Sequence, residues 1–149
     1  MIAALFAAAV AAASPVEIVR QLLDGWRSAD AAEASATFAP EFRLLTLRED
    51  GGGVRLDVDD KAHLMQSMKA LKAGAWDVRP ADMQVHEDAT GIATVWAPYT
   101  FYISGKKSHC GVEAYTLYRL NEGWRIVEFA DTHLWNGSEA ECMDRPPVR

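Results

Sequence analysis

Residues 96–135 read WAPYTFYISGKKSHCGVEAYTLYRLNEGWRIVEFADTHLW, and this stretch decides the fold. It carries most of three runs rich in aromatic and β-branched residues, which predict long strands at Ile92–Ile103, Ser108–Leu120 and Trp124–Trp135. The short connections SGKK and NEG require antiparallel neighbours. A further run, Trp76–His86, predicts a strand that Pro80 bends, bulges or confines to a sheet edge. The sequence therefore predicts a four-stranded antiparallel meander.

Helical patterns and a hairpin precede the meander. Apolar residues at helical spacing, N-capping residues and helix-ending prolines or glycines mark the helices, and the turn residues REDGGG separate two short strands. The predicted segments are helices at Pro15–Trp26, Asp30–Phe38 and Lys61–Leu71 and strands at Phe42–Leu47 and Val54–Val58. Helices followed by a meander, without a linker or repeat, predict one α+β domain over residues 15–149, with the helices on one face of a mostly antiparallel sheet.

The composition excludes several classes of protein. The 149 residues carry a formal net charge of −6, and the only basic cluster, Lys106–Lys107, falls in a predicted turn, so no nucleic-acid partner is expected. The apolar run Ile2–Ala13 is too short to span a bilayer. Its length and small residues favour a signal peptide over residues 1–14, although no basic residue precedes it; the alternative is a disordered Ala-rich segment. Periplasmic or secreted localisation is therefore expected, and cytoplasmic localisation otherwise.

Two cysteines bear on the same question. Cys110 lies in a predicted strand and Cys142 in the tail, and exported chains tend to pair their thiols. We therefore expect a Cys110–Cys142 disulfide if the chain is exported; the alternative is one buried and one exposed thiol. Two distant cysteines lack the spacing of a zinc site, and no glycine-rich phosphate-binding motif is present. We expect neither a metal nor a cofactor.

The loop lengths set a strand register. If Asn121–Gly123 form a three-residue loop, Leu120 opposes Trp124 and Leu117 opposes Val127; by the same count Tyr115 opposes Phe129, Glu113 opposes Asp131 and His109 opposes Trp135. If Ser104–Lys107 form a four-residue loop, Tyr102 opposes His109 and Trp96 opposes Tyr115. All of these residues then share one face, whereas Val95, Val112, Tyr118, Ile126 and Thr132 occupy the other.

The shared face runs from aliphatic through aromatic to polar, as a small-molecule pocket requires. Opposed carboxylates repel each other, so one of Glu113 and Asp131 must take a proton or meet a cation. A pair with one protonated carboxyl group and one carboxylate is the state that acid–base catalysis uses. The alternative is a solvated pair, or pairing with arginines or histidines. Trp26 and Phe38 are expected to cover the sheet, in the first place as core packing. The candidate site comprises catalytic Asp131 and Glu113 and ligand-binding Trp96, Tyr102, His109, Tyr115, Phe129, His133 and Trp26.

The chain resembles the nuclear transport factor two-like superfamily, which includes ketosteroid isomerases and polyketide-cyclase-like proteins. The resemblance covers most of the chain after Pro15 and is most specific in Cys110–Gly111, Gly123–Trp124 and Asp131–Thr132, a pattern similar to a branch of small, uncharacterised bacterial members. It implies a cone-shaped fold, a curved sheet closed by helices around a pocket, and often a homodimer through the outer sheet face. It supports Asp131 as a pocket residue. Position 26 is Trp where the isomerases carry a helical tyrosine, which argues against isomerase activity.

Three functions follow from these observations. The first is an exported domain that binds a small apolar or aromatic molecule. The second is an acid–base enzyme, an isomerase, dehydratase or hydrolase of a cyclic substrate, that uses Asp131 and Glu113. The third is a protein-interaction module that uses the outer sheet face. The first two are separated by one observable, whether the Glu113–Asp131 pair is buried with a raised pKa beside an apolar cavity.

Overall fold

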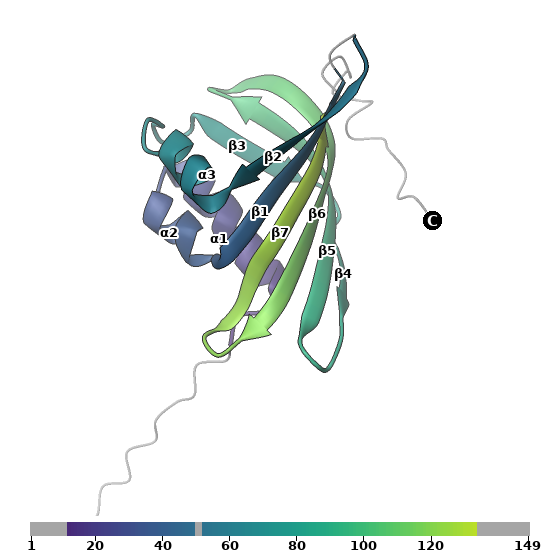
Figure 1. Cartoon of the computed structure of the whole chain (residues 1–149). Helices are drawn as coiled ribbons and strands as arrows, with labels where there is room; N and C mark the ends of the chain where they lie inside the picture. Colours follow the sequence, from purple (N-terminus) through teal and green to yellow (C-terminus); the bar gives the residue numbers. More distant parts are fainter. Residues whose placement is uncertain (1–11, 50–51, 134–149) are drawn as a thin grey trace, which may run out of the picture.

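The computed structural model describes residues 12–49 and 52–133, which form three helices on the concave side of one curved sheet (Figure 1). The helices are α1 (Pro15–Ser28), α2 (Ala31–Ala36) and α3 (Lys61–Met68). The strands are β1 (Phe38–Glu49), β2 (Val54–Asp60), β3 (Trp76–Pro80), β4 (Gln84–Glu87), β5 (Ile92–Ile103), β6 (Lys106–Leu120) and β7 (Gly123–His133). No helix in the described ranges is long and apolar enough to cross a membrane.

Local chemistry explains where the helices begin. Ser14 and Glu17 form a capping box, in which each side chain accepts a hydrogen bond from the other residue's backbone N–H, and Pro15 occupies the first turn of α1. Asp30 caps α2 by accepting hydrogen bonds from two backbone N–H groups, and Asp60 caps α3 in the same way through His63. N-capping side chains therefore mark the beginning of each of these three helices.

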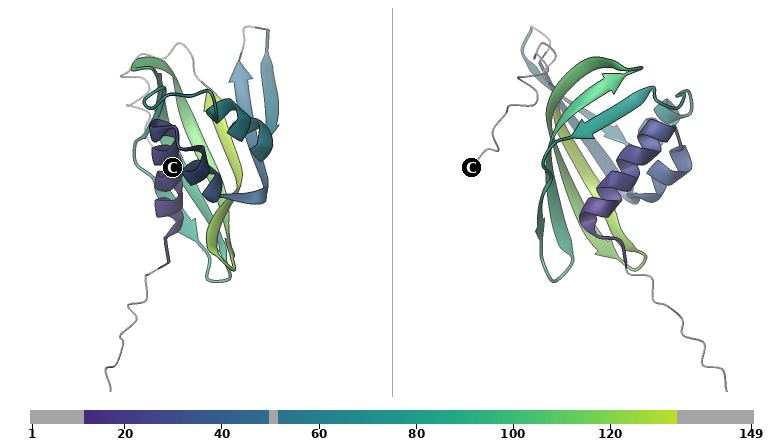
Figure 2. Two further views of the ribbon diagram at one scale, coloured as in Figure 1. Left: turned by 90° about the vertical axis from the view of Figure 1, so that its left-hand side faces the viewer. Right: turned by 180° about the vertical axis from the view of Figure 1, so that it is seen from behind.

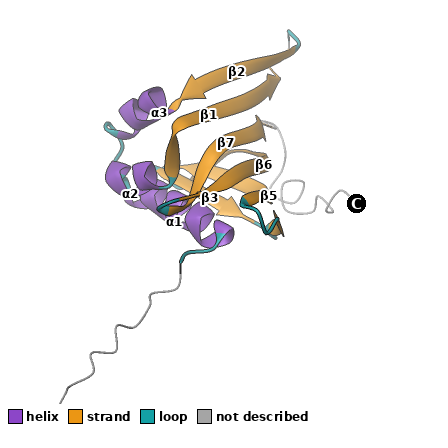
Figure 3. Ribbon diagram, turned by 60° about the horizontal axis from the view of Figure 1, so that its bottom comes forward, coloured by secondary structure: helices purple, strands orange, loops and turns teal. Residues whose placement is uncertain are grey.

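The sheet order is β2-β1-β7-β6-β5-β3, and β4 pairs with β5 beyond the end of β3. All neighbours are antiparallel except β1 and β7, which are parallel (Figure 2). The predicted meander thus forms one side of a larger sheet, from β7 to the edge strand β3, and the predicted hairpin joins it through the pairing of β1 with β7. Figure 3 shows the resulting two layers, with the helices gathered on one face of the strands.

Several predicted boundaries are wrong. The strand predicted over Trp76–His86 is two strands, β3 and β4, and the helix predicted to reach Leu71 ends at Met68. The helix predicted to reach Phe38 ends at Ala36, and the strand predicted from Phe42 begins at Phe38 and runs through Pro40. Pro40 is tolerated because it falls between Phe38 and Arg43. Here the pairing of β1 with β7 is interrupted, and the pairing of β1 with β2 starts only at Arg43.

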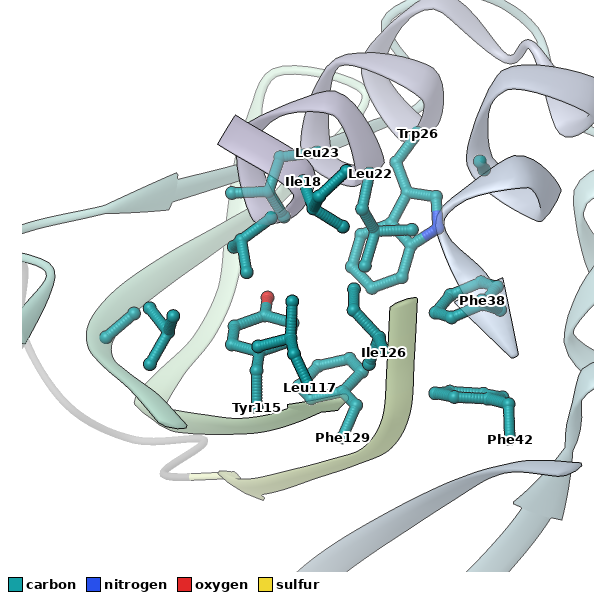
Figure 4. Close-up of a cluster of buried hydrophobic side chains, with 14 of the residues drawn as sticks. Ile18, Leu22, Leu23, Trp26, Phe38, Phe42, Tyr115, Leu117, Ile126 and Phe129 are labelled. Atoms are coloured by element: carbon teal, nitrogen blue, oxygen red, sulfur yellow. The ribbon is translucent and has the colours of Figure 1, made fainter. Parts of the chain in front are cut away.

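The core lies between α1 and the concave face of the sheet. Ile18, Leu22 and Trp26 project from α1 towards Leu117, Ile126 and Phe129 of the central strands (Figure 4). Phe38 and Phe42 stack beside them with ring centroids 4.0 Å apart. The predicted role of Trp26 and Phe38 as core residues is confirmed.

Candidate functional site

A cavity of about 170 Å³ lies between the sheet and the helices. Its wall is mostly apolar and aromatic, and one end carries ionisable side chains. The aromatic residues are Trp26, Trp76, Tyr99, Phe101 and Phe129. The ionisable residues at the other end are Arg48, His109, Glu113, Asp131 and His133.

The predicted pairing of Glu113 with Asp131 is confirmed, as is that of Tyr115 with Phe129. The loop length from which these pairings were predicted is nevertheless wrong by one residue. The loop consists of Asn121 and Glu122, so Leu120 pairs with Gly123 and Leu117 pairs with Ile126. A bulge between Thr116 and Leu117 then restores the predicted register, because Val127 is an extra residue on β7. Ile126, predicted on the outer face, is therefore buried in the core.

The register predicted for β5 is wrong. Ser104 and Gly105, both with positive φ, form a two-residue turn in place of the predicted four-residue loop. This turn alone would shift the predicted register by two residues and keep the predicted faces, but Ser108 is an extra residue on β6, so the net shift is one residue. Val95 therefore pairs with Tyr115 and Phe101 pairs with His109, where Trp96 and Tyr102 had been predicted. A shift of one residue exchanges the faces of a strand.

The exchange removes two predicted residues from the cavity. Trp96 is 40% exposed, and Tyr102 lies under the guanidinium of Arg79, whose Cζ is 4.0 Å from the ring centroid. Tyr99 and Phe101 take their place in the wall, and Val95 is buried in the core. The exchange depends on the bulge at Ser108, which the alternation of β6 does not signal.

Of the other predicted residues, Trp26, His109, Glu113, Phe129, Asp131 and His133 line the cavity. Tyr115 lies behind the wall, where its ring stacks on Phe129 and its hydroxyl donates to Glu113 Oε2 over 2.7 Å. Trp135 and Cys142 lie outside the described residues, so the pairing of His109 with Trp135 and the disulfide stay predictions. Cys110 is buried on β6. Arg48 was missed because the sequence pattern ended the first strand at Leu47.

Glu113 is the ionisable group most affected by its surroundings. Its side chain is almost wholly buried. Burial raises the pKa of Glu113 to about 8, and the charge of Asp131 adds to this, while the hydrogen bond from Tyr115 partly offsets it. At neutral pH Glu113 therefore holds a proton at the polar end of an apolar cavity.

Asp131 and His133 form a second polar pair. Asp131 Oδ2 lies 2.8 Å from His133 Nε2, and the two side chains are only 11% and 7% exposed. The ring of His109 stacks on that of His133 with centroids 3.9 Å apart. Burial lowers the pKa of His109 to about 4, and the neighbouring His133 contributes, so that His109 is neutral at physiological pH.

Two buried polar atoms have no hydrogen-bond partner in the part of the chain that the structure describes: Trp26 Nε1 and Asp131 Oδ1. Both belong to residues of the cavity wall. Among the described residues, no three His, Cys, Asp or Glu side chains are placed to hold a metal ion. The cavity wall thus offers one hydrogen-bond donor, Trp26 Nε1, and one acceptor, Asp131 Oδ1, to a bound molecule.

Comparison with known proteins identifies the fold. No protein-family model matches the chain, and no curated protein matches it. A nuclear transport factor two-like protein with a cystatin-like fold from Novosphingobium aromaticivorans is 19% identical, with a TM-score of 0.62 over 84% of this chain and 82% of that chain. A protein of unknown function with a cystatin-like fold from Nostoc punctiforme is 14% identical, with a TM-score of 0.61 over 80% and 87%.

A nuclear transport factor two-like protein of unknown function from Shewanella baltica is 15% identical, with a TM-score of 0.60 over 80% of this chain and 90% of that chain. These likenesses are structural, and they agree with the helices followed by a curved, mostly antiparallel sheet. The chain has the nuclear transport factor two-like, or cystatin-like, α+β fold that its sequence resembles.

Proposed function

We propose that the chain binds a small, largely apolar or aromatic molecule in the cavity between the sheet and the helices. The observation that carries this proposal is an aromatic-walled cavity of about 170 Å³ with ionisable groups at one end. An apolar cavity of about 150 Å³ accommodates benzene, so the cavity suits a molecule on the scale of one ring.

The unpaired atoms of the wall indicate the polarity of this molecule. A hydrogen-bond donor beside Asp131 Oδ1 and an acceptor beside Trp26 Nε1 would satisfy both atoms. Each buried polar atom left without a partner costs about 1–3 kcal/mol, so a ligand that pairs them gains that free energy on binding.

Mass spectrometry of molecules that co-purify with the protein, followed by ligand-observed NMR with single-ring compounds, tests the binding proposal. Val78→Phe fills the cavity from β3, and Val85→Phe is its control on the exposed side of β4. We expect ligand binding and the associated rise in Tm to be lost in the first variant and kept in the second. Equal binding by both folded variants would place the ligand elsewhere.

A second candidate function is proton transfer within the bound molecule, and the Glu113–Asp131 pair favours it. Glu113 is buried and protonated at neutral pH, and it lies opposite Asp131 in the sheet. An acid and a base whose environments separate their protonation states can act together on one substrate. In this scheme the Asp131 carboxylate takes a proton from the molecule, and the Glu113 carboxyl gives one to another atom of the same molecule.

Exchange of carbon-bound hydrogen for deuterium in single-ring carbonyl compounds, followed by NMR, tests the second function. Asp131→Asn and Glu113→Gln should each reduce exchange by about 10²–10⁴-fold while binding persists. Glu128→Gln is the control, because Glu128 pairs with Arg43 on the outer side of the sheet. If both site variants bind and exchange like the unchanged protein, the chain is a binding protein without this chemistry.

Export, the disulfide and a homodimer through the outer sheet face also remain our proposals. Support for the dimer comes from apolar side chains exposed on that side, among them Trp96 and Tyr118. Cell fractionation with N-terminal sequencing tests export, and native mass measurement tests the dimer. A monomeric mass at micromolar protein concentration would contradict the proposed dimer interface on the outer sheet face.

A further inference from the structure

A row of four polar side chains crosses three strands at the polar end of the cavity. Arg48 Nε donates to Asp57 Oδ2 over 2.8 Å, and Arg48 Nη1 donates to His133 Nδ1 over 3.3 Å. His133 Nε2 in turn lies 2.8 Å from Asp131 Oδ2. The row therefore runs from Asp57 on β2, through Arg48 on β1, to the buried pair on β7.

Backbone pairing holds this row in place. The parallel ladder of β1 and β7 pairs Arg48 with His133 and Thr46 with Asp131, so that the guanidinium and the imidazole come from directly paired positions. On the other side of β1, Thr46 pairs with Asp57. The geometry thus depends on strand register and not on a mobile loop.

The chemistry of arginine decides which nitrogen of His133 carries the proton. A guanidinium only donates hydrogen bonds, so His133 Nδ1 must accept and cannot carry hydrogen in this arrangement. A neutral imidazole with an unprotonated Nδ1 carries its proton on Nε2. That proton points to Asp131 Oδ2, and the imidazole is the donor of this hydrogen bond.

We infer that Arg48 is a positioning residue: it fixes His133 as the Nε2–H tautomer, which occupies Asp131 Oδ2 and leaves Oδ1 as the atom that accepts a proton. This inference rests on the proposed proton transfer. Asp131 Oδ1 is buried and has no partner among the residues that the structure describes. Asp131 Oδ1 is thus available to accept a hydrogen bond or a proton from a bound molecule.

Charged or titratable groups from three strands face His133. Arg48 faces Nδ1 from β1, Asp131 faces Nε2 on β7, and the ring of His109 stacks on it from β6. A proton on Nδ1 would point at the guanidinium, so the hydrogen bond from Arg48 and a proton on Nδ1 exclude each other. His133 therefore orients the base and does not relay the proton.

The tautomer is measured directly by imidazole ¹⁵N NMR on the whole chain at neutral pH without any ligand. We expect neutral His133 with hydrogen on Nε2, and a loss of this preference in Arg48→Met. Arg48→Lys keeps a cationic donor and should restore the preference at least in part. Arg43→Met is the matched control, because Arg43 lies on the same strand and pairs with exposed Glu128.

Hydrogen on Nδ1 in the unchanged protein, or the same tautomer in Arg48→Met, would overturn the inference. In the exchange assay, Arg48→Met should slow the reaction by up to roughly 100-fold with ligand affinity unchanged, because it misaligns a base that remains present. An unchanged protein that shows no exchange would refute the proton transfer alone, since the tautomer experiment does not depend on activity. If Arg48→Met does not fold, the tautomer of the unchanged protein still tests the inference, since hydrogen on Nδ1 would overturn it.

Discussion

At the scale of single residues, two carboxyl groups define this site because their surroundings differ. Glu113 is 1% exposed and accepts a hydrogen bond from Tyr115, whereas Asp131 accepts one from His133. The sequence predicted that the two oppose each other and that one of them would need a proton. It did not predict which one, because the answer depends on burial and on the partner that each receives from neighbouring strands.

The raised pKa of Glu113 predicts a dependence of stability on pH. Between the ordinary value of 4.5 and about 8 the unfolded chain loses this proton and the folded chain keeps it, so the free energy of unfolding falls as pH rises. Glu113→Gln removes the effect and should gain, relative to the unchanged protein, on the order of 4 kcal/mol from pH 4 to pH 8.

Urea unfolding at several pH values measures this difference. His109 acts in the opposite sense, because its lowered pKa reduces stability as pH falls from 6.5 towards 4, but its contribution is common to both proteins and cancels. Glu128→Gln should keep the slope of the unchanged protein. A parallel pH profile for Glu113→Gln and the unchanged protein would show that Glu113 is ionised in the folded state.

At the scale of elements, bulges and turn lengths decide which side chains reach the cavity. The β6–β7 pairing came out correctly at Glu113 because the bulge at Val127 compensated for a hairpin loop counted one residue too long. Between β5 and β6 the loop was counted two residues too long, and the bulge at Ser108 left a net shift of one residue, so Trp96 and Tyr102 were assigned to the wrong face. A bulge depends on contacts across the sheet and leaves little trace in one strand's alternation, whereas the strands themselves were predictable from composition.

At Gly111 of β6 the backbone of Thr132 of β7 lies close by, and we predict that Gly111→Ala damages both stability and the site. A Cβ at this position would lie 1.9 Å from the carbonyl oxygen of Thr132, which also accepts a hydrogen bond from Tyr99. The strands must separate next to Asp131 and His133, at a cost of about 1–3 kcal/mol by urea unfolding.

Gly105→Ala is the control for the Gly111 variant. It replaces a turn glycine with positive φ but meets no atom within 4 Å. It should lose about 1 kcal/mol and keep ligand binding, because the turn is distant from the cavity wall. Full binding by Gly111→Ala would mean that the end of β7 can shift without disturbing the site.

At the scale of the whole molecule, one amphipathic helix covers the sheet and closes the cavity. The apolar face of α1 was predictable from its spacing, and so were the order of helices and strands and the fold that they resemble. The parallel pairing of β1 with β7 was not, because it joins segments about ninety residues apart through no turn. Arg48 reaches the site through this pairing, and the pattern of its own strand carries no sign of it.

Truncation of the buried face of α1 should destabilise the whole fold. Leu22 is fully buried against the sheet, so we predict that Leu22→Ala lowers the free energy of unfolding by about 2–5 kcal/mol. Val54→Ala is the control, because Val54 is largely exposed on β2 and should change stability by no more than about 0.5 kcal/mol. Similar losses of unfolding free energy in Leu22→Ala and Val54→Ala, measured by urea unfolding, would show that α1 does not provide the core.

The parallel pairing of β1 with β7 also determines when the site can exist during folding. Arg48 is made early and His133 late, and the cavity needs both, so no fragment that stops before β7 contains the polar end. Contacts between distant segments close slowly, since the intervening chain must first lose its freedom. The nascent chain therefore lacks the polar end of the cavity until β7 has been synthesised, and the proposed ligand can be bound there only after that point.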